Sequence, residues 1–314
     1  MSTVALLKFR VAIVINKKPT MDKSDQSKMS DDYKKIIIDV FREFISICEQ
    51  NNLNYFCCGG TAIGVVRHKG MIPWDDDIDV LMPRVDYDHF LALMKEDCPT
   101  GYEIVDPKTY KNYYLPFAKF ANSNTTIVEH KNIPCILGAN IDIFPLDGAA
   151  ADRESIAEDY KEFKRNSNKL RSIAKDSRNN WRSFFSHLGQ FQLRTALNEL
   201  KYSVNKTAAR RDVWTELEKI VLKNSLTNSK NAGNYGGMWG IKEFGPTDWF
   251  KNYVYGEFED LKVRIPHEFD KLLTQMYGDY MVPPPVEKRT SHHHVAYINL
   301  NSRLTIEEVM ERIR

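Results

Sequence analysis

Four aspartates fall within five positions of this chain, at Asp75, Asp76, Asp77 and Asp79. Carboxylates this close repel one another unless a positive charge lies between them. The apolar run at 80–82 follows directly and predicts a buried strand, and at the end of a strand the compensating charge is usually a divalent metal ion. The cluster therefore predicts a metal site at one edge of a sheet.

A glycine turn, Gly59-Gly60-Thr61, follows the short apolar segment at 55–58 and opens a predicted helix that runs to Arg67. Backbone N–H groups at the start of a helix can hold a phosphate, and glycine lets the phosphate approach where a side chain would obstruct it. Arg67 or Lys69 could add a cationic contact to the same phosphate. The turn and the aspartates together predict a site for nucleotide phosphates.

Asp142 supplies a third carboxylate, on a separate predicted strand at 139–144 in which apolar and polar residues alternate. Asp77 and Asp79 are two positions apart, so on a strand they project to the same face. Three carboxylates from two neighbouring strands can hold one or two Mg²⁺ ions, with Mn²⁺ as the alternative. Such ions neutralise a phosphate chain and clamp the attacking and leaving oxygens.

Hydrophobic periodicity predicts helices at 33–50, 86–96 and 305–313. Strands are predicted at 55–58, 78–82 and 139–144, and a hairpin is predicted at 113–129, with its turn at Asn122-Ser123-Asn124. The order of glycine turn, helix, strand with two aspartates and later strand with one aspartate indicates a nucleotidyltransferase-like fold. The predicted class is α+β, with a mixed β-sheet core flanked by helices and a mostly helical insertion in the second half.

The segment at 152–223 has helical periodicity and is basic, with 15 Lys and Arg against 6 Asp and Glu between positions 161 and 223. It is either a solvated basic face or a surface that meets anionic lipid headgroups or an anionic acceptor. The expected organisation is a flexible extension at 1–30, a catalytic core at 31–150, this basic insertion at 151–232, and a C-terminal part at 233–314 that completes the domain.

The overall composition excludes several other classes. A net charge of +2 gives no general attraction to nucleic acid, and the five cysteines show no CxxC pair or zinc spacing. They are expected to be reduced thiols of a cytoplasmic protein. The apolar stretch near the N-terminus is short and interrupted by Lys8 and Arg10, so neither a membrane span nor a signal peptide is expected.

The chain closely resembles the LicD family, the bacterial phosphocholine transferases related to fukutin and fukutin-related protein, in the segment GGTAIGVVRHKGMIPWDDDIDVLMPRVDYDHF. The resemblance continues in PFAKFANSNTT (116–126), NIDIFPLDG (140–148), EFGPTDWF (243–250), FEDLKVRIPHEFDKLLTQMYGDYM (258–281) and PPPVEKRTSHHH (283–294). It covers most of 31–294, and the PWDDDID block is highly specific.

The resemblance implies a transferase of the nucleotidyltransferase fold that uses a cytidine-diphosphate-activated alcohol. The metal ligands carry over to Asp77 and Asp79, with Asp142 as the third acidic residue. Asp142 is implied either to ligate metal or to accept the proton of the acceptor hydroxyl, and a shared metal would couple these roles.

Further residues in the matching segments are candidate substrate contacts. Arg67 and His68 are expected to contact phosphate rather than to serve only the fold. Lys119 either neutralises a phosphate or is a surface lysine. Arg289 and His292, in the tail that ends at 294, either close over the donor or are solvated.

The residues and the resemblance together predict an Mg²⁺-dependent transferase of the cytoplasm, peripheral at the inner face of the membrane. It would move a phospho-alcohol, with phosphocholine expected, from a CDP-activated donor such as CDP-choline to a hydroxyl of a cell-surface glycan or its lipid-linked precursor. CMP would be released. The alternatives are a nucleotidyltransferase that moves NMP to a small molecule, and a non-catalytic member of the family that binds glycan.

A quaternary ammonium group in the donor would be held by aromatic faces. The available aromatic residues are Trp74, Trp239, Trp249 and Tyr255, and the sequence does not choose among them.

Overall fold

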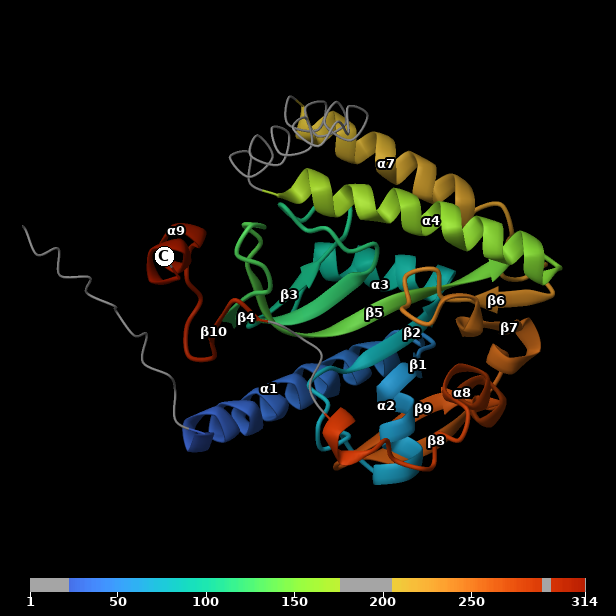
Figure 1. Ribbon diagram of the computed structural model, residues 1–314, viewed down its shortest axis with the longest axis horizontal. Coiled ribbons are helices and arrows are strands. Elements are labelled where there is room, and N and C mark those ends of the chain that lie inside the picture. The colour runs from blue at the N-terminus through green and yellow to red at the C-terminus, as the bar shows by residue number, and fades with distance from the viewer. Residues whose placement is uncertain (1–22, 176–204, 290–294, 314) are drawn as a thin grey trace, which may run out of the picture.

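The computed structural model describes residues 23–175, 205–289 and 295–313 (Figure 1). Its centre is a mixed sheet in the strand order β1-β2-β5-β4-β10, in which β3 also pairs with β4. These strands are β1 (Phe56–Cys57), β2 (Asp79–Pro83), β3 (Tyr102–Val105), β4 (Ala118–Val128), β5 (Leu137–Ala149) and β10 (Tyr297–Asn299). Strands β2 and β5 are parallel and the other pairs are antiparallel, so the predicted α+β class with a mixed sheet is confirmed.

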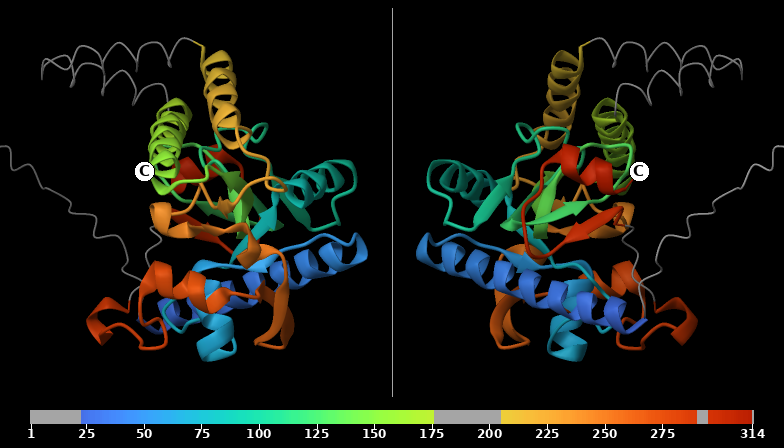
Figure 2. Two further views of the ribbon diagram at one scale, coloured as in Figure 1. Left: turned by 90° about the vertical axis from the view of Figure 1, so that its right-hand side faces the viewer. Right: turned by 90° about the vertical axis from the view of Figure 1, so that its left-hand side faces the viewer.

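Helices cover the sheet on both sides. Helix α1 (Lys23–Gln50) lies on one side, while α4 (Arg153–Ala174) and α7 (Lys206–Val221) lie together on the other (Figure 2). Helix α3 (Arg84–Glu96) follows β2 directly and buries Tyr87, Phe90, Leu91 and Met94. The predicted helices at 33–50, 86–96 and 305–313 are confirmed, the last as α9 (Ile306–Arg312). Helix α1 begins earlier than predicted, at Lys23, within the segment expected to be a flexible extension.

The main core forms where α1 and α3 meet the sheet. Phe44 of α1 packs edge-on against Phe90 of α3, with ring centroids 5.1 Å apart. Phe41 makes a similar contact with Phe258 at 5.8 Å, so the first helix also packs against a strand from the far end of the sequence. Both phenylalanines of α1 are fully buried. Burial of this apolar surface from distant segments stabilises the sheet in one arrangement.

The predicted hairpin at 113–129 is wrong, because β4 is one strand of 11 residues. Its pairing with β5 shifts between Asn122 and Ile127, which is a bulge and not a turn. The Asn122 side chain accepts a hydrogen bond from the backbone N–H of Asn124, and its backbone oxygen accepts one from the Thr125 hydroxyl. Gly138 of β5 lies so close that a Cβ there would come within 2.0 Å of the Asn122 oxygen. Turn-forming residues therefore absorb extra chain length within a continuous strand.

The helical pair α4 and α7 forms a second apolar cluster with Tyr235 and Phe244. Both helices begin at side-chain caps: Asp152 accepts from the N–H of Ser155, and Asn205 accepts from the N–H of Ala208. The described parts of 152–223 are thus helical, as predicted, and residues 176–204 lie outside the described residues.

The rest of the chain returns to the start of the sheet. The elements here are α2 (Gly59–Ile63), η1 (Gly64–His68), β6 (Asn231–Gly233), η2 (Gly240–Glu243), β7 (Phe244–Pro246), η3 (Thr247–Phe250), β8 (Tyr253–Phe258), β9 (Leu261–Pro266), α8 (Phe269–Tyr277) and η4 (Val286–Lys288). Strands β8 and β9 form a separate two-stranded sheet, and in Figure 1 they lie beside α2 and α8. Strands β6 and β7 extend the central sheet from the end of β5. The C-terminal third therefore surrounds the glycine turn.

Candidate functional site

Asp79 is the first residue of β2, and its backbone is held on both sides. Its N–H donates to the Thr61 hydroxyl oxygen at 2.8 Å, and its carbonyl accepts from the N–H of Cys58 at 3.1 Å. Thr61 is 5% exposed. These two hydrogen bonds tie the glycine-turn segment to β2. They fix the backbone position from which the Asp79 side chain extends.

Asp142 lies beside Asp79, because the parallel register of β2 and β5 pairs these two residues directly. The N–H of Asp142 donates to the Ile78 carbonyl at 2.9 Å, which holds that register. Neighbouring paired residues in a sheet point their side chains to the same face. The two strands thus bring together the two carboxylates that the sequence places 63 positions apart.

Lys119 is paired with Asp142 across β4 and β5, and its ammonium lies 2.5 Å from an Asp142 carboxylate oxygen. It also donates to the Asn140 side chain at 3.1 Å and lies 3.6 Å from Glu129. Only 5% of Lys119 is exposed, so the surface-lysine alternative is wrong. These carboxylates outweigh burial and raise the pKa of Lys119 above its usual value, so the residue stays charged.

Asp77 precedes β2, so the expectation that Asp77 and Asp79 share a strand face is wrong. The strand begins only at Asp79, and Asp77 instead groups with Asp75 and Asp76, whose carboxylate oxygens lie within 4.8 Å of one another. The three half-buried aspartates line a loop that Pro73 and Trp74 lead into. Asp75 and Asp76, which the sequence did not assign as ligands, therefore join the acidic group.

Glycine is required at positions 59 and 60 because the backbone there lies very close to the aspartate side chains. Gly59 has a φ of +55°, and a Cβ there would lie 3.3 Å from an Asp79 carboxylate oxygen. A Cβ on Gly60 would come within 2.5 Å of an Asp75 carboxylate oxygen. A side chain at either position would fill the space between the start of α2 and the aspartates.

The electrostatic state of Asp79 reflects this crowding. Burial raises its pKa well above the usual value, and the nearby charges of Asp77, Asp142 and Asp75 raise it further, while Lys119 opposes them. Asp76, Asp77 and Asp142 also act on the hydroxyl of Tyr33 in α1, whose pKa rises chiefly through burial. A group of carboxylates held this close, with oxygen ligands only, has the donor chemistry that Mg²⁺ or Mn²⁺ favours.

Arg67, His68 and Arg289 lie together beside the acidic loop. Burial and Arg289 lower the pKa of Arg67, and burial and Arg67 lower that of His68, whose Nδ1 accepts a hydrogen bond from Arg67 at 3.3 Å. Arg289 lies over the ring of Trp74 at 4.9 Å, and His68 meets the same ring edge-on at 5.9 Å. Arg289 also donates to the Pro284 carbonyl. The predicted contact His292 lies outside the described residues.

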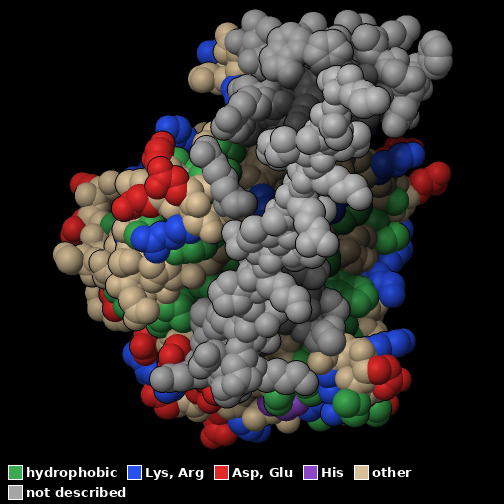
Figure 3. Space-filling model, turned by 60° about the vertical axis from the view of Figure 1, so that its left-hand side comes forward, with side chains coloured by type: hydrophobic (Ala, Val, Ile, Leu, Met, Phe, Trp, Pro, Cys, Tyr) green, Lys and Arg blue, Asp and Glu red, His purple; other side chains and the backbone are tan. Residues whose placement is uncertain are grey.

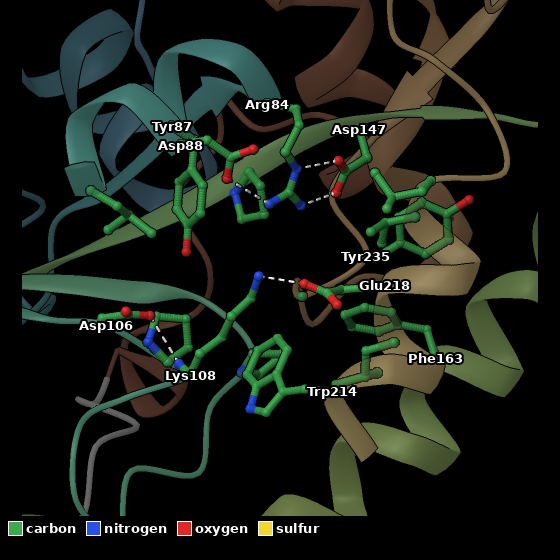
Figure 4. A pocket seen from close by; sticks show the side chains of 18 of the residues that line it. Arg84, Tyr87, Asp88, Asp106, Lys108, Asp147, Phe163, Trp214, Glu218 and Tyr235 are labelled. Carbon is green, nitrogen blue, oxygen red and sulfur yellow. Dashed lines mark hydrogen bonds and ion pairs between the residues drawn. The ribbon is translucent and has the colours of Figure 1, made fainter. Parts of the chain in front are cut away.

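A partly open cavity of about 350 Å³ lies elsewhere, between the sheet, α3 and α7 (Figure 4). Arg84 binds Asp147 through two hydrogen bonds of 2.7 and 2.6 Å, and Lys108 bridges to Glu218 of α7. Asp147 is five residues beyond Asp142 on β5, about 16 Å along the strand. This distance separates the cavity from the acidic site. The charged groups around the cavity are paired with one another.

The face drawn in Figure 3 shows no dominance of one charge in its described part. Lysine, arginine, aspartate and glutamate side chains alternate over the described part of the face in Figure 3. Within the described residues, every helix is too short or too polar to cross a bilayer.

These features define an α+β protein with clustered carboxylates and a glycine turn at one end of a parallel strand pair. Residues 52–168 match the family model described as LicD/FKTN/FKRP, nucleotidyltransferase domain. This match and the similarity described next both support the LicD family for this chain.

Among curated proteins, the chain is similar to the lipopolysaccharide cholinephosphotransferase LicD of Haemophilus influenzae. The two are 29% identical over 260 residues, which cover 82% of this chain and 93% of that protein. An uncharacterized protein of Rickettsia typhi is 39% identical over 61 residues, which cover 19% of this chain and 20% of that protein. The first similarity extends beyond the 52–168 match and includes most of the described structure.

Proposed function

We propose that this protein is an Mg²⁺-dependent transferase that moves phosphocholine from CDP-choline to a hydroxyl of a cell-surface glycan or its lipid-linked precursor and releases CMP. The observation that carries the proposal is the register that sets Asp79 beside Asp142 at the glycine turn. The similarity to a lipopolysaccharide cholinephosphotransferase over most of both chains supports phosphocholine as the group and a glycan as the acceptor.

Asp77, Asp79 and Asp142 are the proposed metal ligands, with Asp75 and Asp76 close enough to contribute. Bound Mg²⁺ would neutralise the diphosphate and stabilise charge on the leaving CMP. The backbone N–H groups at the start of α2 would hold the phosphate next to Gly59 and Gly60, where the missing side chains leave room.

In the reaction, the acceptor hydroxyl oxygen forms a bond to the phosphorus that carries choline. The bond from that phosphorus to the oxygen shared with CMP breaks, and CMP leaves with the electron pair. Asp142 is the proposed proton acceptor for the hydroxyl as well as a proposed metal ligand, because its carboxylate lies beside Asp79 where the acceptor would approach the phosphorus. Lys119 would hold Asp142 in its ionised form and so positions it.

The proposed location is the cytoplasmic side of the membrane, where a lipid-linked acceptor is reached peripherally. The basic character of 161–223 supports contact with anionic headgroups. Cosedimentation with vesicles containing an anionic lipid tests this part separately, and protein that stays in the supernatant at low salt would exclude it.

The central test measures CMP release from CDP-choline, CDP-ethanolamine, CDP-glycerol and CDP-ribitol, with a mixed glycan acceptor and with Mg²⁺ or EDTA. Asp79→Asn should abolish turnover, and Asp248→Asn is a matched control, because Asp248 is a largely exposed aspartate on η3. Metal-dependent CMP release that the first variant loses and the second retains is the expected result. Release of pyrophosphate from a nucleoside triphosphate instead would identify NMP transfer. A folded protein that binds glycan without releasing either product would identify a binding protein.

A further inference from the structure

A trimethylammonium group has no N–H to donate, so proteins hold it through aromatic faces and nearby negative charge. Four aromatic residues of this chain are candidates by sequence, and in three of them one ring face already contacts another group. Arg289 lies over Trp74 at 4.9 Å, and Lys262 lies over Tyr255 at 4.1 Å. Trp249 packs so closely on Gly245 that a Cβ there would come within 2.4 Å of its ring.

Trp239 is the remaining candidate and differs from these three. Its side chain is 46% exposed, and its ring packs against that of Tyr277, with centroids 4.5 Å apart and planes at 66°. In the described parts of the chain, no lysine or arginine lies over either ring. The two rings therefore form an open aromatic corner.

This corner is next to the glycine turn. The position of a Cβ on Gly59 lies 3.6 Å from the Tyr277 hydroxyl oxygen and 3.3 Å from an Asp79 carboxylate oxygen. Tyr277 thus reaches from the aromatic pair to the place where the phosphate is proposed to bind.

An acidic side chain, Glu243, lies on the backbone side of Trp239 and away from the exposed part of its ring. The Glu243 carboxylate accepts the backbone N–H of Trp239 at 2.7 Å and is 9% exposed. A Cβ on Gly237 would come within 2.0 Å of its oxygens, so the loop lies directly over this carboxylate. Glu243 and Asp79 both act electrostatically on Tyr277. A cation at the corner would be attracted by the Glu243 carboxylate when that group is ionised.

We propose that Trp239 and Tyr277 form the subsite for the quaternary ammonium of the donor, and that Trp239 determines the preference for choline over smaller alcohols. This inference rests on the proposed function, since it assigns the residues of the same site that bind the trimethylammonium group of the donor.

Isothermal titration in Mg²⁺ with CDP, CDP-ethanolamine and CDP-choline tests the subsite directly. Trp239→Ala should weaken CDP-choline binding by about 5- to 20-fold, the range of a partly exposed cation–π contact. The affinity for CDP should change less than about 2-fold. If Trp239 only supported the fold of the site, its loss would weaken CDP as much as CDP-choline. Trp239→Phe should recover part of the loss, because it restores an aromatic face. Tyr255→Ala is the matched control and should bind all three ligands as the wild type does.

Equal weakening of CDP and CDP-choline in Trp239→Ala would overturn the inference, as would a wild type that binds CDP-choline no more tightly than CDP. If CMP is released from another CDP-alcohol but never from CDP-choline, the subsite is refuted while the transferase class stands. If the choline preference and its loss in Trp239→Ala are seen without any CMP release, the subsite stands and the proposed reaction fails.

Discussion

The hydrogen bond from Asp79 to Thr61 gives the sharpest test of how the site is held. Thr61→Val keeps the shape of the side chain but removes the oxygen that accepts the Asp79 N–H at 2.8 Å. Thr61 is 5% exposed, so water cannot easily replace that acceptor. Thr61→Ser is the matched control, because it keeps the oxygen and loses only a methyl group.

An unsatisfied buried N–H costs about 1–3 kcal/mol. At about 2–4 °C per kcal/mol for a large domain, the melting temperature of Thr61→Val should fall by about 2–12 °C. The serine variant should lose about 0.8 kcal/mol, the transfer free energy of one buried carbon. Catalysis should suffer more than stability, because a displacement of about 1 Å can cost about 100-fold in rate.

The assay is a thermal melt together with CMP release from CDP-choline at saturating Mg²⁺, both below the lowest melting temperature. We expect Thr61→Val to lose about 10- to 100-fold in kcat and Thr61→Ser to stay within about 3-fold of the wild type. Wild-type turnover in the valine variant would refute the reasoning, because Asp79 would then be positioned by something other than Thr61. Equal loss in both variants would assign the effect to packing.

Three further outcomes follow from buried charges. Lys119→Met leaves Asp142 without its 2.5 Å partner and should destabilise the fold by about 3–5 kcal/mol by urea unfolding, whereas a change below 1 kcal/mol would show that the pair is solvated. Asp147→Asn breaks the bidentate contact with Arg84 and should lower the melting temperature while kcat at low temperature is kept; a parallel loss of kcat would contradict the separation of the two regions. Burial raises the pKa of Glu243 from 4.5 to about 7, so the folded state binds the extra proton and stability falls as pH rises through this window. Glu243→Gln should therefore be more stable than the wild type above pH 7, by about 3 kcal/mol at most, and the difference should vanish below pH 4.5; equal melting curves at all pH values would contradict this.

The sequence predicted the central strands well where one face is plainly apolar. Residues 80–82 and 139–144 appear in β2 and β5, and the Asp79–Asp142 pairing follows from their order. It failed at β4, because the turn-type residues Asn122-Ser123-Asn124 carry the same local signal in a bulge as in a hairpin.

Within the site, the sequence could not foresee contacts that only distant segments create. Lys119 was ambiguous because its burial depends on the pairing of β4 with β5. Tyr277 and Glu243 approach the glycine turn from the C-terminal third, more than 180 positions away, and no local pattern marks them. The i, i+2 spacing of Asp77 and Asp79 predicts a shared strand face, but spacing alone does not say where the strand begins, and β2 begins at Asp79.

The contact between Phe41 and Phe258 also has a consequence for synthesis on the ribosome. The two residues are 217 positions apart, and translation proceeds at about 5–20 residues per second, so Phe41 waits about 10–40 s for its partner. Until Phe258 has emerged from the ribosome, the Phe41 face of α1 lacks this contact. A nascent chain stalled before residue 258 should therefore bind holdase chaperones through the first helix, and the released full-length chain should not.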